Sequence, residues 1–493
     1  MVGLFIMQKI LKYLGFAFAV LFFWLFVVVV SIYRQVDVQG EVRWHSCQRL
    51  AYWSWFVLEK PPAKLQCATI QVPVDYANPD GKQFTLALTR LPSKNPNPIG
   101  DLLLLDGGPG ANSLQMPFMM LGGEYADKVK DNFHLIGYTP RGIAPSSPVI
   151  DCGGLDEVEG AKDYLDACTQ KIGADVLPFI GSKEVVKDLD SIRTRLGVET
   201  WSMVGYSYGT KLVSQYAKHY PTRLRAGVAD GVVDTTEDLF TMLTNQYHNA
   251  QLAFEGFMTF CLAEVSCVFD GDKEPSVAFL ETLHDIEAKN LTDQDGDKIS
   301  AKSMLKIFDE NVNYQVFWYD MVMMFDELNQ GKTNLYDAQK RLSEFAQKGF
   351  NNDALILVNC ADSAPKLSKE DYIKHAKHVD KQAHYDDIMP IRDEEYLDTC
   401  FYWQYQAGDN LAENLVNERT PNLLFVSHEH DLATPFANAK TMAERFDDPL
   451  IVVPYHGHTV SLFGTNLCVD DHVVRYLTDP KTDFGEKVMY CEW

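Results

Sequence analysis

A serine, an aspartate and a histidine follow three separate apolar stretches of this chain. Ser207 lies between two glycines in "GYSYG", Asp431 follows "NLLFVSHEH", and His458 follows "LIVVPYHG". A serine hydroxyl becomes a strong nucleophile when a histidine accepts its proton and a carboxylate orients that histidine. We therefore expect Ser207 to be a nucleophile, His458 its general base and Asp431 the orienting acid.

The residues around Ser207 predict a sharp turn between a strand and a helix. "WSMV" before the serine is typical of a strand, and "TKLVSQYAKHY" after it has helical spacing and ends at Pro221. This setting lifts a serine oxygen clear of the backbone and aims helix amides at charge that develops there. The alternative, a small residue in an ordinary glycine turn, explains neither the strand nor the helix.

Other histidines near the proposed base leave two alternatives open. His456 is the nearest rival, but His458 follows Gly457 directly and leads into the next element. The segment between Asp431 and His458 has room for one crossover helix, which "FANAKTMAERF" supplies. The sequence "HEHD" suggests a metal site, but its two histidines alternate along a strand end and no third ligand is obvious. No metal is therefore expected.

Acyl transfer also needs donors for the developing oxyanion. The sequence "DGGPG", residues 106–110, follows the apolar run "LLLL" and has the form of a glycine turn after a strand. We assign the backbone amides of Gly108 and Tyr208 to this role, with an ordinary loop as the alternative for "GGPG".

These residues require a scaffold that brings strand ends together. Short apolar runs such as "DLLLL", "FHLIGY", "RAGVAD" and "LIVVPYH" alternate with helical patterns, and "CATIQVPVDY" and "KQFTLALTRLP" precede them as strands. This alternation predicts an α/β fold with a mostly parallel, wound sheet. Ligands bind such sheets at the carboxyl ends of the strands, where the proposed site residues lie.

Residues 236–404 interrupt the alternation and predict a largely helical insertion over the sheet. Within it, the methionines of residues 321–324 are expected in a packed helix core, although they could instead line a pocket. The sequence "DQDGDKIS", residues 293–300, resembles a calcium loop, but its glycine is the fourth residue and no glutamate closes it. A turn between two short strands is the better prediction.

The length and the net charge of the chain limit the possible functions further. A chain of 493 residues is long enough for a main domain with an insertion. Its formal net charge of −24 argues against a nucleic-acid partner. The acidity would suit cationic ligands such as peptide amino termini, but a solvated acidic surface is the simpler interpretation.

The N-terminus predicts a membrane anchor. Residues 15–33 are uncharged, long enough to span the hydrocarbon layer as a helix, and preceded by Lys9 and Lys12. A cleaved signal peptide is the alternative, but no good cleavage site follows the run. Ten cysteines all come later and fall into five near-neighbour pairs, which suits disulfides in an oxidising compartment, with their connectivity open.

Several motifs together resemble one peptidase family. "GGPGANS", "YTPRGIAPSSP", "GYSYGT", "ADGVVD", "HDLATP" and "GHTVSLFGTNLCVDDHVVRYLTD" are similar to α/β-hydrolases of the tripeptidyl and prolyl aminopeptidase type, whose C-terminal part is TAP-like. The resemblance runs from about Cys47 to the end. It implies Ser207, Asp431 and His458 as the triad, a helical cap formed by the insertion, and cleavage near a free amino terminus.

The motifs also depart from that family. Asp106 stands where prolyl members have histidine before GGPG, Thr139 replaces their aspartate before PRG, and His428 replaces a common glycine. The first departure favours the tripeptidyl branch. The family further implies an acidic group in the cap for the substrate ammonium, and Asp362 and Glu264 are the candidates, although solvated carboxylates are the simpler interpretation of both.

The sequence therefore predicts an α/β-hydrolase with a mostly parallel sheet, a largely helical cap and an N-terminal transmembrane helix. We expect a serine exopeptidase, single-pass in a bacterial cell membrane and facing the periplasm or exterior, that acts on peptides with a free N-terminus and needs no cofactor. An esterase and a non-catalytic binding protein are the alternatives, as is secretion after signal cleavage. The expected units are 1–35 (anchor), 36–235 (core), 236–404 (cap) and 405–493 (TAP-like core).

Overall fold

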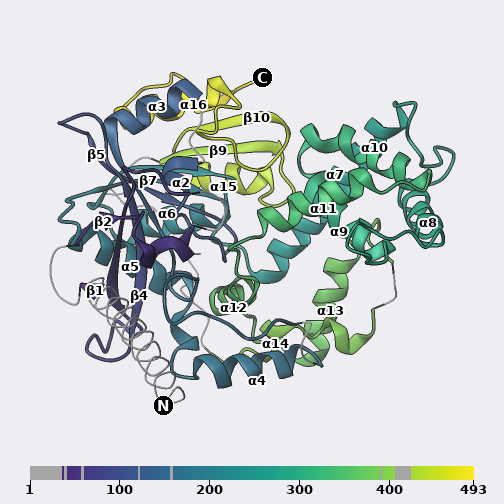
Figure 1. The fold of residues 1–493 in the computed structure, drawn as a ribbon, viewed down its shortest axis with the longest axis horizontal. Helices are drawn as coiled ribbons and strands as arrows, with labels where there is room; N and C mark the ends of the chain where they lie inside the picture. The colour runs from purple at the N-terminus through teal and green to yellow at the C-terminus, as the bar shows by residue number, and fades with distance from the viewer. Residues whose placement is uncertain are drawn as a thin grey trace, which may run out of the picture.

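The chain folds into a sheet-centred core with a helical body beside it, on the left and right of Figure 1. The computed structural model describes residues 36–37, 42–56, 60–119, 123–155, 159–388, 391–405 and 423–492. No helix in these ranges is both long and apolar enough to span a membrane. The predicted anchor, residues 15–33, lies outside them.

An eleven-stranded sheet forms the core. Its strands follow the order β1-β3-β4-β6-β5-β7-β8-β9-β10-β11, and β2 pairs with β3. Strands β6 to β11 run parallel, whereas β4 pairs antiparallel with both β3 and β6. The predicted mostly parallel sheet is thus confirmed. The strands are β1 (Val36–Asp37), β2 (His45–Ser46), β3 (Gln66–Pro73), β4 (Gln83–Leu91), β5 (Gly100–Leu105), β6 (Phe133–Tyr138), β7 (Trp201–Tyr206), β8 (Leu224–Asp230), β9 (Leu423–His430), β10 (Leu450–His456) and β11 (Val488–Tyr490).

Helices cover both faces of this sheet, which explains its unbroken apolar strands. Successive side chains of a strand point to opposite faces. Leu103 and Leu105 accordingly pack with α5 (Ser182–Arg195), α6 (Tyr208–His219) and α15 (Phe436–Phe446). Leu102 and Leu104 pack with α3 (Gly123–Asn132) and α16 (Leu467–Thr478) on the other face. The core helices are α2 (Met116–Met119), α3 (Gly123–Asn132), α4 (Ala161–Ile172), α5 (Ser182–Arg195), α6 (Tyr208–His219), α15 (Phe436–Phe446) and α16 (Leu467–Thr478).

The described chain between β8 and β9 is largely helical, with loops and one isolated β-bridge between its helices, and forms the cap. Aromatic side chains fill its interior, among them Phe254, Phe257, Phe279 and Phe308, with ring centroids about 5 Å apart. Helices α12 and α14 instead pack on the core beside α4. The cap helices are α7 (Leu239–Leu262), α8 (Pro275–Glu287), α9 (Ala301–Val312), α10 (Trp318–Asn329), α11 (Asn334–Ala346), α12 (Asn352–Ser363), α13 (Lys369–Asp380) and α14 (Thr399–Tyr402).

Two cap segments singled out by their sequence have structural roles. Met321 and Met324 are fully buried among the cap aromatics, as expected of a packed helix core. The segment of residues 293–300 contains the predicted turn, but an isolated antiparallel bridge from Thr292 to Lys298 closes this hairpin in place of the two short strands. Its three aspartates, at positions 293, 295 and 297, converge on the ammonium of Lys340 from α11, at 2.7, 3.3 and 3.4 Å.

All ten cysteines are joined in disulfides between near neighbours in the sequence. The predicted five pairs are therefore confirmed. One of them ties α12 to α14 and so fixes the part of the insertion that packs on the core. The pairs are Cys47–Cys67, Cys152–Cys168, Cys261–Cys267, Cys360–Cys400 and Cys468–Cys491.

Candidate active site

Ser207 occupies a strained turn between β7 and α6. Its backbone angles, φ 54° and ψ −123°, lie in a region that L-residues other than glycine seldom adopt. Its N–H donates to the carbonyl of Asp230 at 2.9 Å, and its carbonyl accepts the hydroxyl of Thr210 at 2.7 Å. The turn is therefore held from both sides, as an exposed serine nucleophile requires.

The glycines on either side of Ser207 are required by close backbone packing. A Cβ on Gly205 would lie 2.4 Å from the carbonyl oxygen of Gly209. A Cβ on Gly209 would lie 2.4 Å from the carbonyl oxygen of Leu105 at the end of β5. The pattern "GYSYG" thus lets α6 begin directly against β5 and β7.

Asp431 and His458 come together at the ends of β9 and β10. The Nδ1 atom of His458 lies 2.8 Å from Oδ2 of Asp431, which is fully buried. Burial alone would raise the pKa of Asp431, but the attraction and hydrogen bond of His458 bring it below its usual value. Burial alone would lower the pKa of His458, but Asp431 raises it above 6.5. The pair is thus arranged to stabilise an imidazolium.

Thr434, which the sequence analysis did not single out, completes the acid's hydrogen bonds. Its hydroxyl donates to Oδ2 of Asp431 at 2.8 Å and lies 3.3 Å from Nδ1 of His458. The N–H groups of Ala433 and Thr434 donate to Oδ1 of Asp431 at 2.9 and 3.0 Å. An aspartate followed by a threonine three residues later in "HDLAT" is the local signal for such a turn.

The end of β8 brings the serine and the histidine together. Asp230, its last residue, accepts the N–H of Ser207, and Gly231 follows with φ 69°. A Cβ on Gly231 would lie 2.9 Å from Cε1 of His458. The His458 ring therefore packs on the residue next to the one that holds Ser207.

The glycine loop after β5 runs beside the serine. A Cβ on Gly107 would lie 2.7 Å from Cβ of Ser207, and the Gly107 N–H donates to Oδ1 of Asp106 at 2.8 Å. The next residue, Gly108, is exposed and has φ 106°. Tyr208 is the first residue of α6, so its N–H has no acceptor within that helix. The Gly107 amide is thus already hydrogen-bonded, whereas Gly108 is exposed and the Tyr208 amide has no acceptor in its own helix.

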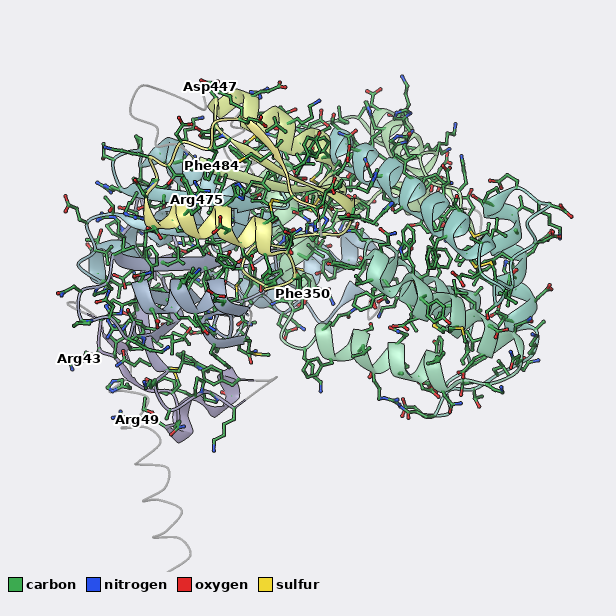
Figure 2. The ribbon with its side chains drawn as sticks, turned by 90° about the horizontal axis from the view of Figure 1, so that it is seen from above. Arg43, Arg49, Phe350, Asp447, Arg475 and Phe484 are labelled. Atoms are coloured by element: carbon green, nitrogen blue, oxygen red, sulfur yellow. A yellow bond between two sulfur atoms is a disulfide. The ribbon has the colours of Figure 1, made fainter. Side chains whose placement is uncertain are left out.

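The cap covers this loop through Phe350, which Figure 2 shows at the junction of the two bodies. A Cβ on Gly108 or Gly110 would lie 3.0 Å from the Phe350 ring. A recess opens beside the loop, lined by Gln115 and Met116 from the core and by Phe350 from the cap. The cap therefore shapes the space next to the glycine loop.

The rival histidines have other environments. His456 stacks on His430 with ring centroids 4.6 Å apart and lies 4.7 Å from the ring of Trp318 in the cap. Burial and the neighbouring histidines lower the pKa of His456 to about 4. His428 is buried, with Nδ1 3.1 Å from the carbonyl oxygen of Tyr455, and burial lowers its pKa. The histidine that meets Asp431 is therefore His458.

Metal ligation finds little support in the described part of the chain. The group with suitable proximity there is Cys468, His472 and Cys491. Its two cysteines form a disulfide, so neither can supply the thiolate that a metal needs.

The two candidate ammonium acceptors are placed differently from the expectation. Asp362 is buried and pairs with Lys211 of α6 at 2.8 Å, and it also accepts the N–H of Ser182 at 2.7 Å. This carboxylate joins α12 to the core, so it is neither free for a substrate ammonium nor solvated, as the simpler interpretation expected. Glu264 lies past the end of α7, in the loop closed by the Cys261–Cys267 disulfide.

Comparisons with known proteins extend over nearly the whole chain. The putative hydrolase YuaR of Escherichia coli (strain K12) is 30% identical over 460 residues, covering 89% of this chain and 91% of that protein. Serine protease Hip1 of Mycobacterium tuberculosis (strain ATCC 25618 / H37Rv) is 28% identical, covering 85% and 86%. The tripeptidyl aminopeptidase of Streptomyces lividans is 25% identical, covering 90% and 85%. A family model described as TAP-like protein matches residues 390–489. The resemblance inferred from the motifs is confirmed.

Proposed function

This chain belongs to the α/β-hydrolase family of the tripeptidyl aminopeptidases and serine protease Hip1 and is a serine hydrolase, and we propose that it is an exopeptidase acting near the free N-terminus of peptides. The observation that supports catalysis by a serine nucleophile is the strained turn at Ser207, beside the His458–Asp431 pair. The peptidase assignment is supported by relatives named serine protease and tripeptidyl aminopeptidase.

In the proposed reaction, Ser207 Oγ attacks the scissile carbonyl carbon while Nε2 of His458 accepts its proton. Nδ1 of His458 keeps its proton and donates it in a hydrogen bond to Asp431. That bond fixes the tautomer, and the carboxylate stabilises the imidazolium. The tetrahedral intermediate collapses, the C–N bond breaks, and His458 returns the proton to the leaving amine. Water then attacks the acyl-enzyme by the same route and restores the free serine.

The amides of Gly108 and Tyr208 are proposed to stabilise the oxyanion. Asp106 supports this choice, because it occupies the Gly107 amide and leaves the Gly108 amide as the next donor. The N-terminus of α6 adds a favourable dipole at Tyr208. The departure from the histidine of the prolyl members is thus compatible with an intact oxyanion site.

The cap is proposed to select the substrate. It contacts the catalytic acid's loop directly, since Oδ1 of Asn313 accepts the N–H of Leu432 at 3.1 Å and the amide of Gln246 donates to the carbonyl of Ala433 at 2.7 Å. Cap helices therefore enclose the site on the side of Asp431. Such enclosure favours short or terminal substrates over internal segments of folded proteins.

We also propose that residues 15–33 anchor the protein as a single span in a bacterial cell membrane, with the catalytic part in the periplasm or outside. The five disulfides support an oxidising compartment. The test is membrane fractionation combined with the N-terminal sequence of the mature protein. A mature chain that begins after residue 33 would show secretion instead.

The catalytic proposal is tested by labelling purified protein with a fluorophosphonate probe. Wild type should label on Ser207, and Ser207→Ala should lose both labelling and peptide hydrolysis. Ser214→Ala is a matched control on the same helix, because Ser214 is buried and its hydroxyl has no hydrogen-bond partner. Peptide hydrolysis that survives in Ser207→Ala would contradict the proposal, and an unlabelled wild type would favour a binding protein.

The substrate class is tested separately on the same preparations. Rates on aminoacyl- and tripeptidyl-amides are compared with rates on short acyl esters, and the products from a mixed peptide library are identified. We expect short peptides released from free amino termini, with acetylated amino termini resistant. Rapid ester cleavage without amide cleavage would show an esterase on the same fold.

A further inference from the structure

Asp230 joins the serine and the histidine through interactions that the catalytic triad does not include. It is completely buried at the end of β8, opposite Tyr206 of β7. Its backbone carbonyl accepts the N–H of Ser207 at 2.9 Å. The end of β8 therefore holds the nucleophile in its strained turn.

The side chain of Asp230 holds the loop that follows His458. Its Oδ2 atom accepts the N–H of Val460 at 2.7 Å and that of Ser461 at 2.6 Å. The loop is strained, because Thr459 is not a glycine and yet has φ 61°. Two hydrogen bonds to one carboxyl oxygen offset that strain and fix the residues next to the base.

Asp230 also contributes negative charge near the imidazole. Burial alone would lower the pKa of His458, but Asp431 and, to a smaller extent, Asp230 raise it. The Oδ1 atom of Asp230 is buried and has no hydrogen-bond partner among the described residues, although the Ser461 side chain helps to lower the pKa of this carboxyl. A buried carboxylate oxygen without a donor gains most from a nearby cation, and the imidazolium formed during catalysis is one.

Two histidines interact with the charge of Asp230: His428, which lowers its pKa, and His458, whose own pKa Asp230 raises. Tyr206 faces Asp230 from β7, His428 from β9 and Asp470 from α16. Burial raises the pKa of Asp230 above its usual value, although the N–H groups of Val460 and Ser461, the Ser461 side chain and His428 oppose that rise. Burial lowers the pKa of His428, so this ring is neutral at pH 7.

Asp470 offers a matched control for the loop. Its Oδ1 and Oδ2 atoms accept the N–H groups of Leu462 and Gly464 at 2.5 and 3.0 Å. It therefore holds the same loop with the same chemistry as Asp230. Of these two aspartates, Asp230 is among the groups that shift the pKa of His458, and Asp470 is not.

We propose that Asp230 is a positioning residue that fixes the Ser207 turn and the His458 loop relative to each other and places a second negative charge beside the imidazolium. The inference rests on the proposed function, because it takes Ser207 as the nucleophile and His458 as its base. Asp230 neither touches the substrate nor exchanges a proton in this role.

The test compares the rate of fluorophosphonate labelling across pH in wild type, Asp230→Asn and Asp470→Asn. Asparagine keeps an acceptor for the loop amides but removes the charge. We expect Asp230→Asn to label about tenfold more slowly at pH 8 and its acid limb to move to lower pH. In Asp470→Asn the acid limb should stay at its wild-type position. An unshifted acid limb in folded Asp230→Asn overturns the proposal.

A second variant keeps the proposal testable even if Asp230→Asn does not fold. Asp431→Asn removes the triad acid but leaves Asp230 in place, so it should label measurably faster than His458→Ala. Equal rates for these two variants also overturn the proposal. Wild-type labelling that does not depend on His458 would instead contradict the proposed function.

Discussion

The contact between Gly107 and Ser207 predicts that one added methyl group disables the nucleophile. In Gly107→Ala the new Cβ would lie 2.7 Å from Cβ and 3.2 Å from Oγ of Ser207. Carbon atoms normally approach to about 3.5–4.0 Å, so the two loops must separate by about 1 Å. Ser207 cannot yield freely, because Asp230 and Thr210 hold its backbone on both sides.

The expected loss follows from that displacement. A misplacement of about 1 Å costs on the order of 100-fold in kcat, which corresponds to about 2.7 kcal/mol of barrier. Overpacking should also lower the free energy of unfolding by about 1–3 kcal/mol. The variant should therefore fold at 25 °C but hydrolyse peptides and react with a fluorophosphonate far more slowly than wild type.

The assay sets kcat beside urea unfolding for two alanine variants. Gly100→Ala is the matched control, because Gly100 begins the strand that ends just before Gly107 and a Cβ there meets nothing within 4 Å. It should keep wild-type kcat and stability. A Gly107→Ala enzyme with wild-type kcat would refute the proposed packing of the glycine loop against the nucleophile.

Three further predictions concern the acid, the base and a buried ion pair. Thr434→Val removes a hydrogen bond to the Asp431 carboxylate and should lower kcat/KM about tenfold, whereas Thr434→Ser should keep it; equal losses would contradict this role. Because the pKa of His458 is raised, kcat/KM should rise with pH through a value above 6.5. The stability that charged His458 adds below pH 6.5 should be lost as pH rises through that same value. An acid limb of kcat/KM below pH 6.5 would contradict the assignment of His458 as the base. Asp188→Asn leaves buried Arg141 without the carboxylate that it now binds at 2.6 and 2.7 Å. Urea unfolding should show that the free energy of unfolding falls by about 3–5 kcal/mol, and an unchanged value would contradict the expected cost of an unpaired buried charge.

Features encoded by neighbouring residues were accessible from the sequence. An apolar run that stops at a polar residue marks a strand end, and the structure places Ser207, Asp431 and His458 after the ends of β7, β9 and β10. The spacings between cysteines suggested near-neighbour pairs for the same reason but left their connectivity open, and the structure has five such pairs. Thr434 was also accessible, because its hydroxyl returns to an aspartate only three residues earlier.

Features that depend on distant segments were not accessible. Asp230 accepts amides about 230 residues further along the chain, and no local pattern announces this. Asp362 looked like a free carboxylate in the cap, but its partner Lys211 lies 151 residues earlier on a core helix. The sequence shows that a buried charge needs a partner but does not show which of the 44 lysines and arginines provides it.

The ammonium of Lys340 among three aspartates has a consequence for the assembly of the cap. Lys340 is the counterion of the hairpin's aspartates, so the hairpin does not need a cation from the surrounding medium. Its like charges repel one another until α11 arrives, and the hairpin and α11 should therefore gain order together, as one cooperative unit. Because this cation is covalently part of the chain, neither dilution nor a chelator can remove it from the hairpin.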